Sequence, residues 1–132
     1  TWETEHMNTK QLTAAETIVM KCIWDSAEDL GVSQITSIVN ETYKKGWKQQ
    51  TVSTFLVRLV KKEFLEMHRK GRYFYYHPKV TKEQFRDQIL KDYFGFWNNG
   101  DAATFVKGLF ESDVLTKQQK REVKEQVSVQ NV

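Results

Sequence analysis

The chain has 132 residues, 39% of them hydrophobic, which is enough for one compact domain or a small domain with a shorter appended one. Its single cysteine excludes an internal disulfide framework and a cysteine-rich zinc module, and no apolar run approaches the roughly 20 residues of a membrane span. The net charge of +3 is unevenly spread: residues 44–72 hold nine basic and two acidic side chains, whereas residues 1–43 hold two and seven. Such a basic surface is typical of duplex-DNA binders, with a solvated lysine-rich surface as the alternative.

The first residues are interpreted as lying outside the fold. Residues 1–6 resemble the remnant of an expression tag ahead of Met7. No signal-peptide pattern opens the chain, so we expect a cytoplasmic protein without membrane insertion. Thr13 and Glu16 have the spacing of a capping box, which predicts the start of a first helix. Cys22 falls in the apolar pattern of that helix, and we interpret it as a buried packing residue.

A second helix is predicted to begin at Ser33, which is a good N-cap residue. Ahead of it, Gly31-Val32 could form a very short strand. The helix is expected to end near Lys44-Lys45, where Gly46 can adopt the left-handed conformation of a helix stop. Two helices and a turn therefore lead into the basic part of the chain.

The basic part begins with a third predicted helix, over residues 49–62. From Val52 onward, apolar residues recur at i, i+3, i+4, i+7 and i+8, the pattern of one buried helical stripe. The opposite face carries small hydrogen-bonding side chains and one arginine, which suit the base edges of a DNA major groove. These residues are Gln50, Thr51, Thr54, Arg58 and Lys61.

A β-hairpin is predicted to follow this helix. Residues 65–68 alternate apolar with polar, Lys70-Gly71 supplies a turn, and residues 72–77 have high strand preference. Three helices followed by a hairpin with a basic tip predict a winged helix-turn-helix whose wing reaches toward phosphate. The predicted DNA-binding residues are Ser33, Lys48, Gln50, Thr51, Ser53, Thr54, Arg58, Lys61, Lys62, Arg69, Lys70 and Arg72.

Two features of the hairpin leave alternatives open. His68 and His77 could be a metal-sensing pair, but neither has a cysteine or carboxylate partner nearby in sequence, so we favour two half-exposed strand histidines. The aromatic run from Tyr73 to Tyr76 could be a stacking platform for single strands. Strand alternation favours instead one pair of rings in the core and the other pair exposed.

After Pro78 the sequence predicts three short helices. Thr81 and Thr116 each open a capping box, and Asp101 caps the helix between them. We predict a winged-helix domain at residues 7–78 and a helical domain at residues 79–132. The helices carry more large apolar side chains than they can bury, so pairing with a second copy is favoured over folding back. The predicted dimerisation residues are Phe85, Ile89, Tyr93, Trp97, Phe105 and Phe110.

The chain shows no zinc-ligand spacing, phosphate-binding glycine loop or catalytic Ser/His/Asp arrangement, so we expect no enzyme activity and no cofactor or metal. Besides the order of elements, a set of short motifs is informative: Leu12–Glu16, Val19-Met20, Ile23-Trp24, Trp47, Thr51–Thr54, Arg58–Lys62, Phe64-Leu65, Gly71-Arg72 and Phe74–Tyr76. In these residues the chain resembles the penicillinase-repressor family, the BlaI/MecI/CopY transcriptional repressors.

The resemblance implies a mainly α fold with a small β-hairpin and a three-helix C-terminal dimerisation region. It also implies a homodimeric repressor that binds a palindromic promoter operator and controls β-lactam resistance genes. Repression would end when the C-terminal dimerisation region is cut by a protease, after a membrane receptor-protease senses a β-lactam. The cleaved bond would align with Gly108-Leu109; alternatively, Gly108 serves to allow close helix packing at the dimer interface. Lys48-Gln49 replaces the usual helix cap, and Glu63 replaces a common glycine. The chain has no cysteine after Cys22, which favours the BlaI/MecI branch over the copper-responsive one.

Alternative functions are a ligand-responsive winged-helix regulator and a winged helix that serves only as a protein-interaction module. A basic helix face favours DNA over a protein partner.

Overall fold

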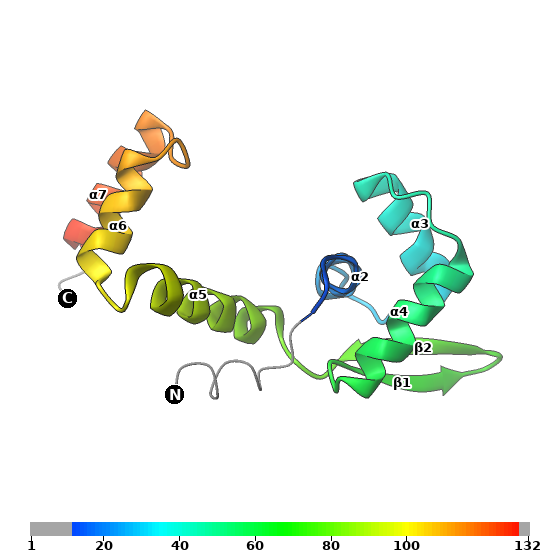
Figure 1. The fold of residues 1–132 in the computed structure, drawn as a ribbon. Coiled ribbons are helices and arrows are strands. Elements are labelled where there is room, and N and C mark those ends of the chain that lie inside the picture. The colour runs from blue at the N-terminus through cyan, green and yellow to red at the C-terminus, as the bar shows by residue number, and fades with distance from the viewer. Residues whose placement is uncertain (1–11, 130–132) are drawn as a thin grey trace. The chain divides into compact units, whose positions relative to one another are not determined.

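The computed structural model describes residues 12–129, so the predicted tag lies outside the described residues. The chain forms two compact units, Thr1–Asp87 and Gln88–Val132, called here the N-terminal and C-terminal units. Figure 1 shows the order of the elements. Those that lie wholly in the N-terminal unit are α2 (Ala14–Trp24), α3 (Val32–Tyr43), α4 (Gln49–Lys61), β1 (Leu65–Lys70) and β2 (Tyr73–Pro78).

The capping box that the sequence predicts for α2 is present. The backbone N–H of Glu16 donates to Thr13 Oγ1 at 3.2 Å, and the backbone N–H of Thr13 donates to Glu16 Oε1 at 2.8 Å. The predicted start of α3 at Ser33 is wrong. Gly31 is the N-cap, because the side chain of Gln34 reaches back and accepts from the Gly31 N–H at 2.9 Å. Ser33 is therefore the second residue of the helix.

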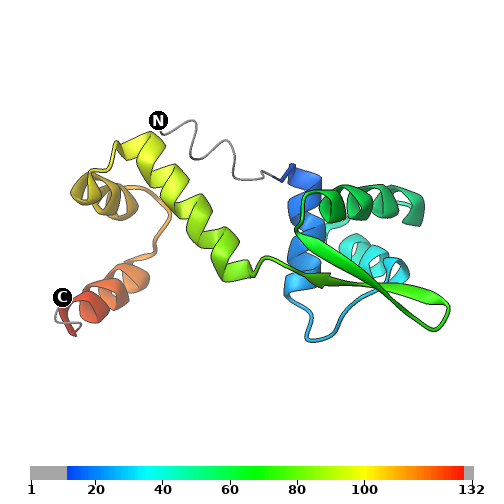
Figure 2. The ribbon, with the colours of Figure 1, turned by 90° about the horizontal axis from the view of Figure 1, so that it is seen from below.

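Helices α2, α3 and α4 pack around one core, which the inner end of the hairpin closes (Figures 1 and 2). Each helix contributes one apolar stripe, as the sequence periodicity predicts. The largest fully buried side chains include Met20, Ile35, Leu56, Leu59 and Leu65. Cys22 belongs to this core, and burial raises the pKa of its thiol to about 11.

The wing is a two-stranded antiparallel hairpin in which Lys70 pairs with Tyr73 and Leu65 with Pro78. Gly71 takes a φ of +68°, which the tight turn requires. The expected short strand at residues 31–32 does not form, because Gly31 caps α3 and Val32 begins that helix. The preceding residue, Leu30, makes one isolated bridge with Tyr76. Only Tyr76 of the aromatic run is buried, because the hairpin projects beyond the core toward its tip (Figures 1 and 2).

After the wing comes α5 (Lys82–Asn98), whose first turns, up to Asp87, belong to the N-terminal unit. The Trp24 Nε1–H donates to the Val80 carbonyl at 2.8 Å, and the ring of Phe85 lies 5.4 Å from that of Trp24 and 5.6 Å from that of Phe64. The compact units accordingly divide after Asp87 rather than after residue 78. Phe85, predicted at a dimer interface, packs within its own chain.

The remaining helices are α6 (Ala102–Glu111) and α7 (Lys117–Val129). Their predicted caps form: Asp101 accepts from the Thr104 N–H at 3.1 Å, and Thr116 with Gln119 makes a capping box. No side chain of α5 or α6 is buried. Within residues 12–129, none of the helices is both long enough and apolar enough to span a membrane.

Candidate nucleic-acid interface

Helix α4 presents the polar face that its sequence predicts. Gln50, Thr54, Arg58 and Lys61 are exposed, and Thr51 and Ser53 are half-exposed, while the opposite stripe enters the core. The helix begins without a side-chain cap, because Lys48 occupies the N-cap position. The first N–H groups of α4 are therefore not satisfied by a capping side chain, and a helix N-terminus in this state favours an anion such as phosphate.

One apolar residue on this face was not among the predicted contacts. Val57 is 53% exposed, and a rotation of 100° per residue places it between Ser53 and Gln50 around the helix. The signal was present in the sequence, since Val57 lies outside the buried apolar stripe. An exposed apolar side chain among hydrogen-bonding ones suits the methyl group of thymine.

The turn between α3 and α4 is held by Asn40. Its amide donates to the Trp47 carbonyl at 2.9 Å, and its oxygen accepts from the Trp47 N–H at 2.8 Å. The Trp47 ring packs against Phe55 at 5.1 Å, and the guanidinium carbon of Arg58 lies 5.9 Å from the centroid of the Phe55 ring. This stacking orients Arg58 by a cation–π contact.

A groove of about 540 Å³ lies between the start of α3, the start of α4 and strand β2. Ser33 and Gln49 line it and meet across it, with Gln49 Nε2 donating to Ser33 Oγ at 3.3 Å. Ser53 lines the α4 side and Arg72 the wing side. The structure thus brings three of the predicted DNA-binding residues to one groove. Gln49 was missed, because its partner in α3 lies 16 residues away.

The wing tip is basic and exposed, as predicted. Arg69, Lys70 and Arg72 are all exposed. Arg69 Nε donates to the Gly71 carbonyl at 3.0 Å, which ties that side chain across the turn. Positive charge on a projecting hairpin can reach the phosphates beside a groove that a helix occupies.

Lys62, which was predicted to bind DNA, forms an ion pair within the N-terminal unit. Its ammonium is 2.6 Å from Oε1 of Glu16, a residue that is 0% exposed. Burial raises the pKa of Glu16, but hydrogen bonds from Lys62 and the Thr13 backbone outweigh that effect and hold it below its usual value. The pair joins the start of α2 to the end of α4, so Lys62 is a structural residue.

The residue after Lys62 explains how α4 stops. Glu63 has a φ of +65°, the left-handed conformation for which glycine is favoured. Glu63 therefore adopts the helix-ending conformation even though it replaces the glycine that is common at this position. Lys79 Nζ contacts Glu63 Oε2 at 2.5 Å.

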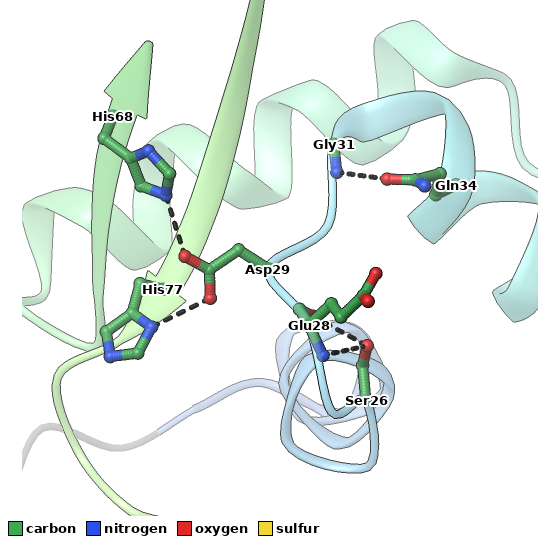
Figure 3. Close-up of polar contacts among 7 residues, drawn as sticks. All are labelled: Ser26, Glu28, Asp29, Gly31, Gln34, His68 and His77. Carbon is green, nitrogen blue, oxygen red and sulfur yellow. Dashed lines mark hydrogen bonds and ion pairs between the residues drawn. The ribbon is translucent and has the colours of Figure 1, made fainter. Parts of the chain in front are cut away.

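The wing histidines meet a carboxylate that sequence proximity did not reveal. Figure 3 shows both imidazole rings directed at Asp29, which lies in the loop between α2 and α3. His68 Nε2 is 2.8 Å from Oδ2 of Asp29, and His77 Nδ1 is 2.8 Å from Oδ1. Both rings are half-exposed, as expected. In the part of the chain that the structure describes, no group of three or more His, Cys, Asp or Glu side chains is arranged to hold a metal ion.

Comparisons with known proteins agree with this geometry. A family model described as "Penicillinase repressor" matches residues 12–128. The penicillinase repressor of Bacillus licheniformis is 27% identical over 113 residues, which cover 86% of each chain. The methicillin resistance regulatory protein MecI of Staphylococcus aureus is 23% identical over 117 residues, covering 88% of this chain and 92% of MecI.

Among solved structures, the DNA-binding domain of the repressor BlaI is similar, with 30% identity and a TM-score of 0.50. The match covers 58% of this chain and 89% of that domain, a share that fits a winged helix-turn-helix followed by a helical C-terminal region. The family model extends through almost all of the described residues. The chain therefore belongs to the penicillinase repressor family.

Proposed function

We propose that the protein is a transcriptional repressor that binds duplex DNA through α4 and the wing. The observation that carries this proposal is the exposed face of α4, where hydrogen-bonding side chains surround one apolar residue. Its family membership and its likeness to a DNA-binding domain support the same function. An interaction module without DNA binding would be expected to show an apolar or acidic face in this place.

In this proposal α4 enters the major groove. Gln50 and Arg58 bond base edges, because amide and guanidinium groups match the adenine and guanine patterns there. Val57 contacts a thymine methyl group. Lys48 and Lys61 with the wing tip neutralise phosphates, which fixes orientation without reading sequence.

The proposed repressor is a homodimer that pairs through the C-terminal unit. Large apolar side chains there remain exposed, including Tyr93 at 54% and Trp97 at 66%. A monomer gains little from exposing so much apolar surface, and a second copy offers the same surface. Two winged helices would then occupy two half-sites of a palindrome. The proposed interface residues are Ile89, Tyr93, Trp97, Phe105 and Phe110.

Repression would end by cleavage in α6, and the regulated genes would be those for β-lactam resistance. The Gly108-Leu109 bond lies in a helix without buried side chains, and the Gly108 carbonyl accepts from the Ser112 N–H at 3.0 Å, at the end of that helix. Opening this turn costs little, which makes the bond accessible to a protease. A Cβ added at Gly108 would meet no atom within 4 Å in the chain. Gly108→Ala should therefore slow cleavage by stabilising the helix.

The test of DNA binding is selection from a random-sequence duplex library by the full-length chain. We expect enrichment of a palindrome with half-sites about one helical turn apart, and hydroxyl-radical protection of both half-sites. Enrichment of no sequence over the starting library would overturn the proposal. The cleavage proposal is tested separately, by immunoblotting cells that carry the chain with its receptor-protease after adding a β-lactam. A chain that stays intact while its genes are induced would contradict it.

A further inference from the structure

We propose that Asp29 positions the wing for DNA by holding His68 and His77 together, and that this hold weakens as the pH rises through neutrality. The inference rests on the proposed DNA binding. Each carboxylate oxygen of Asp29 accepts from a different ring, at 2.8 Å in both cases (Figure 3). His68 belongs to β1 and His77 to β2, so one side chain of the helical part ties both strands of the wing.

The loop that carries Asp29 is itself fixed against the wing. The Tyr76 N–H donates to the Leu30 carbonyl at 3.0 Å, directly beside Asp29 in sequence. At Gly31, an added Cβ would lie 3.2 Å from the Phe74 carbonyl oxygen, so loop and strand approach closely. Asp29 therefore projects from an anchored backbone, and its two bonds constrain the hairpin beyond the single bridge at its base.

The surroundings make this constraint depend on protonation. The hydrogen bond from His77 lowers the pKa of Asp29, with a further bond from His68, and the bond to Asp29 raises the pKa of His77. The ring of His68 stacks on Tyr75, with centroids 6.1 Å apart. The other charged groups around the cluster are Asp25 and Glu28 of the loop, Glu66 of β1, and Lys82 and Glu83 of α5.

The direction of the pH effect follows from these shifts. A raised pKa means that the charged His77 stabilises the folded wing fully below its ordinary pKa of 6.5, and that this stabilisation disappears as the pH rises through the folded value. Asp29 must also be ionised, and its lowered pKa keeps it so at mildly acidic pH. The bond from His77 to Asp29 is thus charge-assisted in mildly acidic solution, and in alkaline solution it weakens to a bond from a neutral ring.

The consequence for DNA is mechanical. The wing carries Arg69, Lys70 and Arg72 at its tip, and phosphate contacts require these charges to lie at a fixed place relative to α4. A loosened hairpin loses more conformational entropy when it binds DNA, which weakens binding. We therefore expect affinity to fall with rising pH more than the loss of histidine charge alone would cause.

The experiment compares the full chain with Asp29→Asn, and with Glu28→Gln as a matched control in the same loop. Affinity for the duplex selected from the random library is measured at about pH 6 and about pH 8. Because the rings are half-exposed, we expect the wild-type and Glu28→Gln ratios to exceed the Asp29→Asn ratio by about two- to fivefold. If histidine charge acted directly on DNA, Asp29→Asn would keep or enlarge the pH dependence, which would overturn the proposal.

A second readout needs no DNA. Hydrogen exchange of the amides of residues 66–77, corrected for intrinsic rates, should speed up from about pH 6 to about pH 8 in the wild type and be fast at both in Asp29→Asn. His77→Gln should also abolish the pH dependence. Equal wing protection in wild type and Asp29→Asn at both values would overturn the proposal. If protection behaves as expected but no duplex is bound specifically, the proposed function fails while the hold on the wing stands.

Discussion

The two compact units differ in how far their apolar side chains are buried. In the N-terminal unit, residues from α2, α3, α4 and both strands share one core, and Val19, Ile35, Val52 and Leu56 are completely buried. In the C-terminal unit, no residue from 88 to 128 is buried, although its helices are as well capped. Capping starts a helix but does not stabilise a short one without packing. We therefore expect the first unit to fold alone, and we expect the second to need further apolar contacts, which the proposed dimer would supply.

Removing the C-terminal unit tests this difference most severely. A chain ending at Asp87 should keep a cooperative unfolding transition, because Phe85 and the whole core remain. It should be monomeric in sedimentation experiments and bind the palindromic duplex about 10²- to 10⁴-fold more weakly, since paired half-sites lose their avidity. A truncated chain that still sediments as a dimer would show that the dimer interface lies in the N-terminal unit, which contradicts the proposal.

Within the N-terminal unit, adjacent lysines should behave differently. Lys62→Met should lower the free energy of unfolding by about 2–3 kcal/mol, because the carboxylate of Glu16 stays buried without its cation. Lys61→Met should change stability by less than about 0.5 kcal/mol and instead weaken DNA binding. Urea unfolding and fluorescence anisotropy measure the two effects.

A double variant checks the cause of the Lys62 effect. Glu16→Gln together with Lys62→Met should recover part of the lost stability, because glutamine keeps the capping box without a buried charge. If the double variant is less stable than Lys62→Met alone, charge is not the reason for the loss.

Arg58 tests whether the exposed face of α4 reads sequence. Arg58→Ala should cost about 1–3 kcal/mol on the selected duplex and relax the preference at one base pair. Lys61→Ala is the matched control on the same face, and it should weaken selected and random duplexes equally. Equal losses on both duplexes for Arg58→Ala would remove its base-reading role.

The wing should contribute charge rather than sequence preference. Replacing Lys70 and Arg72 together with alanine should reduce the slope of log affinity against log salt by about two units. The double substitution should leave the selected consensus unchanged. An unaltered salt slope would show that the wing tip lies away from the phosphates.

The smallest effect concerns the end of α4. Glu63→Gly should raise the free energy of unfolding by about 0.5 kcal/mol, because glycine accepts the φ of +65° without steric cost. The substitution also removes the exposed ion pair to Lys79, which is worth little. Lys79→Ala measures that contribution separately, and a loss of stability in Glu63→Gly larger than in Lys79→Ala would contradict the argument.

Local chemistry made most of the fold predictable. Capping boxes at Thr13, Thr81 and Thr116 act over three residues, and all of them form as expected. The start of α3 was misplaced because the N-cap is a glycine, whose backbone N–H donates to the Gln34 side chain. This pattern is less familiar than a serine at the N-cap. The polar face of α4 followed from periodicity alone.

The contacts that escaped prediction join residues far apart in sequence. Lys62 reaches Glu16 across 46 residues, and Asp29 reaches His77 across 48. Charge counts give no indication of which lysine turns inward, because that depends on how α2 crosses α4. Phe85 was assigned to a dimer for the same reason: its neighbours Trp24 and Phe64 are set by tertiary packing.

The bridge between Leu30 and Tyr76 also protects the edge of the hairpin. An open strand edge invites another chain to extend the sheet, and natural proteins block such edges with charge or with a covering segment. Here Leu30 covers the outer edge of β2 at Tyr76, and β1 is lined with charged and polar side chains such as Glu66 and Arg69. Strand addition between copies is thereby disfavoured. We therefore expect the exposed wings of separate copies to remain unpaired at high protein concentration.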